Sequence, residues 1–334
     1  VVKKTACANC PIACDHLCLV KEGPYKDTIA SVDFESIFAL GSCCGVSDMA
    51  AIIKAIDLCD RHTIDTMSGG VCVAFGMECF ENGLITKEDT NGLDLRFGNA
   101  EAMVEFVDQI CSRSSKAGDI IAEGSRRAAE KIGKNASKYA MHSKGLELPG
   151  YHLSALKTAA VGFAVSIRGG CHLRNGAYSP DVKGKFDRFK ENEPEKRAAA
   201  IKGTEDMYAV IDSYIICKFT RGIYKDTNEM AKVYELVTGF PFTGDDLMKT
   251  GERILNLSKC FNIREGWTRD DDTLPERFFK EPQTKGPAKG VTVNRDGFER
   301  IKSAYYAGRG WDEKGIPTDE KLKELGLDFV IGNL

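Results

Sequence analysis

SDMAAIIKAIDLCDRH, residues 47–62, gives the clearest indication of the kind of fold this chain adopts. Its apolar residues recur at spacings of three and four, which places them on one face of an α-helix. Ser47 is the expected N-cap, and Asp48 lies in the first turn, where a carboxylate offsets the helix dipole. The segment therefore predicts an amphipathic helix with one face in a hydrophobic core.

Similar patterns on both sides of this segment predict a mostly α fold with little β-structure. Further helices are expected over residues 70–83, 99–118, 119–133, 203–217, 227–238, 244–261, 295–307 and 318–325. The segment 159–170 fits either a helix or a strand. A change of domain is placed near residue 145, in HSKGLELPGY, which divides the chain into two helical domains, residues 1–145 and 146–334.

Composition excludes several classes of protein. The 334 residues carry a net charge of −3 without a basic stripe, so a large nucleic-acid surface is not expected. No apolar run reaches the roughly 20 residues that span a bilayer, and VVKKTACANC lacks the apolar core of a secretory signal. Most of the 13 cysteines lie singly in apolar stretches, as buried thiols do in a reducing compartment. We therefore expect a cytoplasmic protein without membrane insertion.

Two polar segments that contain proline interrupt the second half of the chain. They are SPDVKGKFDRFKENEPEKR, residues 179–197, and RDDDTLPERFFKEPQTKGPAKG, residues 269–290. Their charge runs are typical of solvated surface. They are predicted to be surface loops or lids that gate a substrate site.

Four cysteines cluster near the start of the chain, in ACANCPIACDHLC, residues 6–18. They are Cys7, Cys10, Cys14 and Cys18. The C-x2-C-x3-C spacing suits three thiolate ligands of a [4Fe–4S] cluster, with a fourth from elsewhere. Zinc and a metal-free loop are the alternatives, although the loop is too tight for an ordinary zinc ribbon. Local spacing does not decide whether Cys18 or a remote cysteine is the fourth ligand.

Several motifs together resemble one known family. They are DFESIFALGSCCGVSD (33–48), DLCDRHTIDTMSGG (57–70), KGLELPGYH (144–152), RGGCHLR (168–174), IDSYIICKFT (211–220), KCFNIREGWTRDDDTLPERF (259–278) and GRGWDEKGIPTDEKLKELGL (308–327). In this order they look like the carboxy-terminal helical domains of the aldehyde:ferredoxin oxidoreductases. The resemblance implies an enzyme that oxidises an aldehyde at a tungsten, or molybdenum, bis-pterin beside a [4Fe–4S] cluster. The amino-terminal domain that cradles the pterins has no counterpart here, so we expect a fragment or one part of a larger enzyme.

The resemblance also implies which residues bind the cluster. In this family three loop cysteines and the last residue of a D-x-x-G-L-C motif are the ligands. That motif reads DSYIIC here, which makes the ligands Cys7, Cys10, Cys14 and Cys217. Cys18 then becomes a spare thiol, expected to be packed in the protein.

Two related motifs would face the two pterins. DRHTID supplies Asp60 and Asp65, and DSYIIC supplies Asp212. A carboxylate suits this role because it accepts two N–H bonds from the edge of a pterin. The glycine of each family motif is replaced here, by Thr63 and by Ile215.

Glu35 and His172 match the family's residues near the metal. Glu35 would act as a general base on water or the aldehyde hydrate, and His172 would orient or protonate the carbonyl oxygen. Tungsten-containing benzoyl-CoA reductases carry a cysteine at the position of Glu35, so this residue favours aldehyde oxidation over ring reduction. His142 and His152 are weaker candidates. Adjacent cysteines at 43 and 44 are interpreted as packing residues.

The resemblance implies further partners and leaves alternatives. Electrons would pass to ferredoxin or a ferredoxin-like subunit in an anaerobic cytoplasm, and magnesium is a further cofactor to consider. A homo-oligomer is expected, although the helix around Lys54 shows no convincing ligands for the iron that many family dimers share. The alternatives are another tungsten-pterin oxidoreductase, an iron–sulfur electron-transfer subunit without its own pterin, and a zinc-stabilised helical protein.

Overall fold

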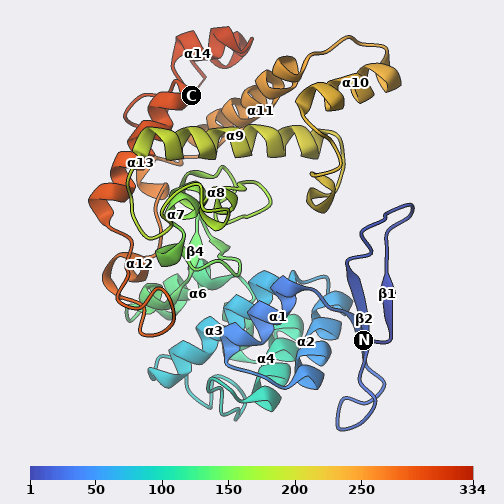
Figure 1. The fold of residues 1–334 in the computed structure, drawn as a ribbon. Helices are drawn as coiled ribbons and strands as arrows, with labels where there is room; N and C mark the ends of the chain where they lie inside the picture. Colours follow the sequence, from blue (N-terminus) through green and yellow to red (C-terminus); the bar gives the residue numbers. More distant parts are fainter. Residues whose placement is uncertain (334) are drawn as a thin grey trace. The chain divides into compact units, whose positions relative to one another are not determined.

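The computed structural model describes residues 1–333 and is predominantly helical, which confirms the predicted mostly α class (Figure 1). The chain divides into two compact units, one of residues Val1–Gly150 and one that begins at Tyr151. Among the described residues, no single helix has the length and apolar character needed to cross a bilayer. One bent pair, Phe34–Cys44 with Met49–Arg61, meets that criterion of length and composition with an angle of 118° between its helices.

The first unit begins with a small antiparallel sheet that the sequence did not predict. Its strands are β1 (Lys3–Thr5), β2 (Asp15–Leu19) and β3 (Ile29–Ser31), in that order. Cys18 lies opposite Ala30 in the register of β2 and β3, and both side chains are buried in the core of the unit. A short hairpin of β4 (His142–Ser143) and β5 (Leu146–Glu147) lies near its end. Strands this short show too few residues for alternation to be recognised.

Helices build the rest of the first unit. They are α1 (Phe34–Leu40), η1 (Ser42–Cys44), α2 (Met49–Arg61), α3 (Thr66–Glu81), α4 (Ala100–Ser112), α5 (Lys116–Ile121), α6 (Ser125–Ile132) and η2 (Ala136–Tyr139). α3 is buried along most of its length and packs against α1. A Cβ on Gly70 would lie 2.5 Å from the carbonyl carbon of Ala39, so the close approach of these two helices requires glycine. This contact fixes α1, which carries Glu35.

Helix boundaries in the first unit follow the capping side chains. Asp48, and not Ser47, caps α2, because its carboxylate accepts the N–H groups of residues 50 and 51 at 2.8 and 3.3 Å. The helix predicted over 99–118 is divided into α4 and α5, and only the latter part of the one predicted over 119–133 forms α6. Arg113 ends α4 in the left-handed conformation, and the Ser115 hydroxyl caps α5 by accepting the N–H of Gly118. Gly118 is thus inside a helix and does not end one.

The second unit is a set of helices around three long ones. Its elements are η3 (Leu153–Ala155), α7 (Lys157–Val165), α8 (Tyr178–Val182), α9 (Pro194–Ser213), η4 (Lys218–Thr220), α10 (Thr227–Thr238), α11 (Gly244–Arg264), η5 (Arg269–Asp271), α12 (Arg277–Lys280), α13 (Arg295–Arg309), α14 (Asp319–Glu324) and η6 (Asp328–Val330). α9 packs against both α11 and α13 (Figure 1). The ambiguous segment 159–170 contributes to α7, whose residues are all buried. α9 begins earlier than the predicted residue 203, because Pro194 suits the first position of a helix.

The segment 179–197, predicted as a loop or lid, is anchored by a buried arginine. The guanidinium of Arg197 donates to the carboxylate of Asp181 at 3.0 Å and to the carbonyl oxygens of Asp187 and Lys190, each at 2.8 Å. The side chain of Arg197 is fully buried. The segment therefore wraps around this charge, and this anchoring gives no support to a mobile lid.

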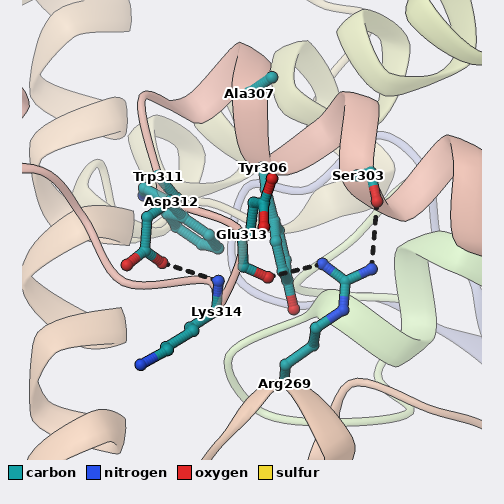
Figure 2. Close-up of a pocket in the computed structure, with 8 residues that line it drawn as sticks. All are labelled: Arg269, Ser303, Tyr306, Ala307, Trp311, Asp312, Glu313 and Lys314. Carbon is teal, nitrogen blue, oxygen red and sulfur yellow. Dashed lines mark hydrogen bonds between the residues drawn. The ribbon is translucent and has the colours of Figure 1, made fainter.

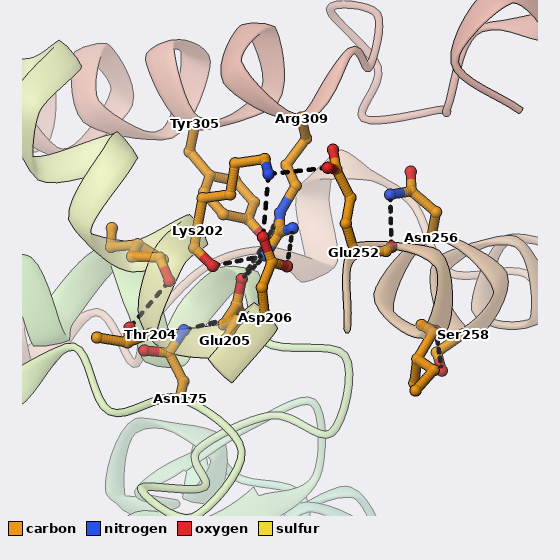
Figure 3. Close-up of polar contacts among 12 residues, drawn as sticks. Asn175, Lys202, Thr204, Glu205, Asp206, Glu252, Asn256, Ser258, Tyr305 and Arg309 are labelled. Atoms are coloured by element: carbon orange, nitrogen blue, oxygen red, sulfur yellow. Dashed lines mark hydrogen bonds and ion pairs between the residues drawn. The ribbon is translucent and has the colours of Figure 1, made fainter. Parts of the chain in front are cut away.

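A second buried arginine, Arg309 on α13, joins the long helices (Figure 3). It donates to the carboxylates of Glu205 and Asp206 on α9, and the Glu205 contact is 2.7 Å. Asp206 also pairs with Lys202 at 3.0 Å, and Lys202 pairs with Glu252 on α11 at 3.1 Å. The network thus crosses α9, α11 and α13.

Replacing Arg309 with methionine is expected to lower the free energy of unfolding by about 3–5 kcal/mol, because buried Glu205 loses its cation and Asp206 keeps only Lys202. Denaturant unfolding of the variant measures this loss. The control is Arg300→Met, an exposed residue on the same helix, with an expected effect of about 0.5 kcal/mol or less. Equal effects of the two substitutions would contradict the structural role of Arg309.

Candidate metal and cofactor site

The loop between β1 and β2 presents the first three predicted cluster cysteines. Cys7 and Cys14 are exposed and Cys10 is partly exposed, while Cys18 lies buried in β2. The hydroxyl groups of Thr5 and Ser31 donate to the Asp15 carboxylate at the base of the loop. These side-chain hydrogen bonds anchor the loop at its end, and its thiols stay accessible.

The chemistry of these thiols suits metal ligands better than that of the buried cysteines. Among residues 1–333, no three His, Cys, Asp or Glu side chains converge closely enough to hold a metal ion. A thiol must lose its proton to bind metal. Burial raises the pKa of Cys43 to about 11 and that of Cys59 and Cys79 to about 12, so these thiols stay protonated at neutral pH. The exposed thiols of Cys7, Cys14 and Cys217 carry no such burial.

The two motifs predicted to face the pterins share one backbone turn. In the first, Thr63 N–H donates to the Asp60 carbonyl at 3.2 Å and residue 64 donates to residue 59 at 2.9 Å. In the second, Ile215 N–H donates to the Asp212 carbonyl at 3.0 Å and residue 216 donates to residue 211 at 3.4 Å. Both are Schellman motifs at helix C-termini. Thr63 and Ile215, with φ of 57° and 56°, occupy the left-handed position that usually requires glycine.

Each turn ends in a residue that caps the next helix. The Asp65 carboxylate accepts the N–H of Ser68 at 2.7 Å and begins α3. The Cys217 sulfur accepts the N–H of Phe219 at 3.4 Å and begins η4. Asp65 therefore has a structural task beside its predicted pterin contact.

The aspartates at the start of the two turns differ in their surroundings. Partial burial raises the pKa of Asp60, and the negative charges of Asp57 and Asp33 add to the shift. The Asp212 carboxylate instead accepts Arg174 Nη1 at 2.8 Å and the ammonium group of Lys218. Two positions with the same backbone thus have opposite electrostatic environments.

Glu35 lies in the first turn of α1, in the same unit as the cysteine loop. Its carboxylate accepts the N–H of Gly150 at 2.9 Å. A Cβ on Gly150 would lie 3.0 Å from the ring of Phe38, so a side chain there would disturb this contact. Burial raises the pKa of Glu35, and the Gly150 hydrogen bond opposes the shift. A carboxyl group with a raised pKa suits general-base catalysis.

His172 lies in the second unit, in a turn surrounded by aromatic rings. The ring of Tyr151 is 5.4 Å from that of His172 and 4.6 Å from that of Tyr178, between centroids. Phe163 packs edge-on against Tyr151 at 6.1 Å. The imidazole therefore belongs to a mostly apolar cluster within its own unit.

The other predicted residues have structural surroundings. Burial lowers the pKa of His142, which accepts the N–H of Gly145 at 3.2 Å, and that of His152, which packs on Phe278. Cys44 is fully buried and its thiol donates to the carbonyl groups of Ala39 and Gly70. These packing and hydrogen-bond contacts give each of the three residues a structural role.

The sequence and the fold of the chain are similar to those of known proteins. A family profile described as "Aldehyde ferredoxin oxidoreductase, domains 2 & 3" matches residues 1–327. The chain belongs to the aldehyde ferredoxin oxidoreductase family. The tungsten-containing aldehyde ferredoxin oxidoreductases of Pyrococcus horikoshii and Pyrococcus furiosus are each 36% identical to it, over 98% of this chain and 53% of theirs. The sequence-based assignment of the family is confirmed.

Two more distant relatives show how wide the similarity is. The chain is 31% identical to the WOR-like subunit of an aliphatic sulfonate oxidoreductase of Pyrococcus furiosus, over 96% of this chain and 49% of that subunit. Its fold matches the active-site complex BamBC of benzoyl coenzyme A reductase with a TM-score of 0.80 at 21% identity, over 98% of this chain and 53% of that one. The chain spans about half the length of the curated relatives that it matches.

A pocket on the surface of this family member does not coincide with the candidate site. It has a volume of about 530 Å³ and lies in the second unit (Figure 2). Arg269 at its edge already donates to the Glu313 carbonyl at 2.8 Å and to the Ser303 hydroxyl at 3.1 Å. Trp311 Nε1 donates to Asn256 at 2.7 Å. Because these polar groups bond to the protein and none of the predicted site residues lines the pocket, we do not assign it a ligand.

Sequence reasoning missed Arg174 and Lys218, the two cations on Asp212. Both stand inside quoted family motifs, RGGCHLR and IDSYIICKFT. The arginine is separated from the aspartate by 38 positions, so their pairing needs the fold. Lys218, six positions from Asp212, was within reach of a local charge argument.

Replacing Ile215 with glycine is expected to raise the free energy of unfolding by about 1 kcal/mol. The left-handed conformation costs a β-branched residue more than the roughly 1–2 kcal/mol typical of L-residues, and glycine removes this strain. The greater conformational entropy of glycine in the unfolded chain offsets part of the stabilisation. The side chain is 93% exposed, so little packing is lost. Thermal and denaturant unfolding measure the change.

The matched control is Ile223→Gly, since Ile223 is also exposed, at 61%, but has a negative φ. That variant is expected to lose stability by about 0.5–1 kcal/mol. A destabilised Ile215→Gly protein would contradict the strained turn.

Proposed function

We propose that this chain forms the helical part of a tungsten-pterin enzyme that oxidises an aldehyde to a carboxylate. The observation that carries the proposal is the repeated Schellman turn at Asp60–Asp65 and Asp212–Cys217. Threonine and isoleucine occupy the left-handed positions where the family motifs carry glycine. The family match and the exposed cysteine set support the same proposal.

The residues present suit the cofactors that the family implies. Cys7, Cys10, Cys14 and Cys217 would hold a [4Fe–4S] cluster, since its irons take thiolate ligands. Asp60 and Asp65 would accept N–H groups of the pterins. The resemblance assigns the same role to Asp212, whose carboxylate already accepts Arg174 and Lys218. When bound, the tungsten-pterin would supply a two-electron acceptor for the oxidation, and the cluster would supply a one-electron carrier.

Glu35 and His172 would handle protons in this reaction. An aldehyde and water give a carboxylate, three protons and two electrons. Glu35, when deprotonated, would take a proton from the attacking water or the aldehyde hydrate, and burial brings its pKa nearer to neutral. His172 would donate a hydrogen bond to the carbonyl oxygen, and its aromatic surroundings would exclude water.

The remaining assignments follow the family. We propose ferredoxin or a ferredoxin-like subunit as the electron acceptor, and a homo-oligomeric, cytoplasmic protein of an anaerobic cell. Glu35 supports aldehyde oxidation in preference to ring reduction. The similarity to the sulfonate oxidoreductase subunit makes an aliphatic sulfonate the first alternative substrate to assay.

Metal analysis tests the cofactor assignment. The anaerobically purified protein is expected to contain about four iron atoms per chain, together with tungsten, and to oxidise small aldehydes with ferredoxin. Cys217→Ala should lose most of its iron, because a cluster ligand is removed. Cys18→Ala is the control and should keep its iron, because its thiol is buried in β2.

Three results would overturn the assignment. Iron without tungsten indicates an electron carrier, and zinc without iron indicates a zinc-stabilised protein. Loss of iron in Cys18→Ala with retention in Cys217→Ala would make Cys18, and not Cys217, the fourth cluster ligand.

Replacing Glu35 with glutamine is expected to lower aldehyde turnover by about 10²–10⁴-fold, the usual contribution of a general base. In the wild type, kcat/KM should rise with pH through an inflection above the ordinary carboxyl range. The same raised pKa means that the wild type loses stability as pH rises through it. Glu35→Gln should therefore be the more stable protein at neutral pH, with no difference near pH 3.

The control is Glu105→Gln, an exposed residue on α4 that should change neither turnover nor the pH dependence of unfolding. Full turnover by Glu35→Gln would remove Glu35 from the mechanism.

A further inference from the structure

The Asp212 carboxylate lies between two cations that come from different segments of the second unit. Arg174 donates from the turn that follows His172, at 2.8 Å to Oδ2. Lys218 donates to Oδ1 from the residue that follows Cys217. Both oxygens of the carboxylate therefore already accept charge-assisted hydrogen bonds, the strong kind.

Lys218 is built into the protein and is not a surface charge. Its side chain is only 9% exposed, and its ammonium group also donates to the Tyr208 carbonyl at 2.9 Å. The same group lies 4.9 Å from the centre of the Tyr208 ring. Asp212 and Tyr208 are both on α9, so Lys218 ties the start of η4 to the end of that helix.

Arg174 is joined to an equally fixed segment. The next residue, Asn175, is fully buried and donates to Glu205 at 2.8 Å and to the Gly162 carbonyl at 2.9 Å. The turn that carries His172 is thus held on α7 and α9 from one side. The Arg174–Asp212 pair holds it to the end of α9 from the other.

Asp60, the equivalent residue of the first motif, has no comparable cation among residues 1–333. The charges that act on it are those of Asp57 and Asp33, which are negative. Its carboxylate is at the end of α2 with the same backbone as Asp212. The common turn therefore presents one carboxylate that is committed to the protein and one that is exposed to a ligand.

We infer that the two motif aspartates have different tasks: Asp212, clamped by Arg174 and Lys218, is a positioning residue that joins the His172 turn to the Cys217 loop, while Asp60 accepts the N–H groups of a pterin. This inference rests on the proposed function for the identity of the ligands. The clamp itself depends only on the contacts within the second unit.

The clamp is tested first in the metal-free protein, by hydrogen exchange of the Phe219 and Thr220 amides, whose acceptors are the Cys217 sulfur and carbonyl. Asp212→Asn and Lys218→Met are expected to accelerate this exchange about tenfold, and Lys218→Arg should restore most of the protection. Asp60→Asn and Lys225→Met, an exposed lysine of the same segment, should leave it unchanged. Unchanged exchange in both clamp variants would overturn the inference.

The roles of Asp212 and Asp60 are then distinguished in the protein purified anaerobically with its metals. Lys218→Met and Asp212→Asn should lose at least half of their iron or alter the electron paramagnetic resonance spectrum of the reduced cluster, with tungsten retained. Asp60→Asn should lose tungsten and keep its iron. Loss of tungsten with normal iron in Asp212→Asn would return Asp212 to the pterin and overturn the division.

Failure of the proposed function would look different. If Cys217→Ala keeps all of its iron, the ligand assignment fails whatever the clamp variants do. Accelerated exchange in Lys218→Met and Asp212→Asn would still support the clamp in that case.

Discussion

Arg309 is the charge around which the second unit is built (Figure 3). A fully buried guanidinium is costly unless its donors are satisfied, and here they meet Glu205, Asp206 and the Lys202 carbonyl. The three long helices must therefore keep a fixed register. Glu205 in turn accepts Asn175, so the same network reaches the turn of His172. A candidate catalytic residue thus depends on an ion pair in the core of its unit.

The helical class could be predicted from the sequence because most helices are long and amphipathic. The segment 227–238 matches α10, and α4 begins within one residue of the predicted start at residue 99. The predicted elements were wrong where a capping side chain or a backbone turn, and not the apolar periodicity, sets the local structure. Ser115 begins a new helix inside an apolar run, and the short strands β1–β3 form by pairing between segments. Neither effect is encoded in a repeat of 3.6 residues.

In the candidate site, too, residues with a local sequence signal could be predicted, whereas contacts between distant segments could not. Motifs pointed to Glu35, His172 and the cysteines, because those residue types carry recognisable chemistry. The surroundings that tune them come from elsewhere in each unit: Gly150 donates to Glu35, and Arg174 meets Asp212 only when the turn and the helix are packed. Substitution of glycine by Thr63 and Ile215 made the motifs look weakened, yet both positions keep the left-handed backbone.

The turn shared by Asp60–Asp65 and Asp212–Cys217 delivers its last side chain in the same way each time, as the cap of the following helix. In one copy that side chain is a hard oxygen donor, and in the other a soft sulfur donor. The backbone conformation is the same with either side chain, because both atoms can accept an N–H group. One amino-acid difference on a common scaffold therefore changes the donor that the turn presents, from an oxygen that accepts N–H groups to a sulfur that suits a thiophilic metal.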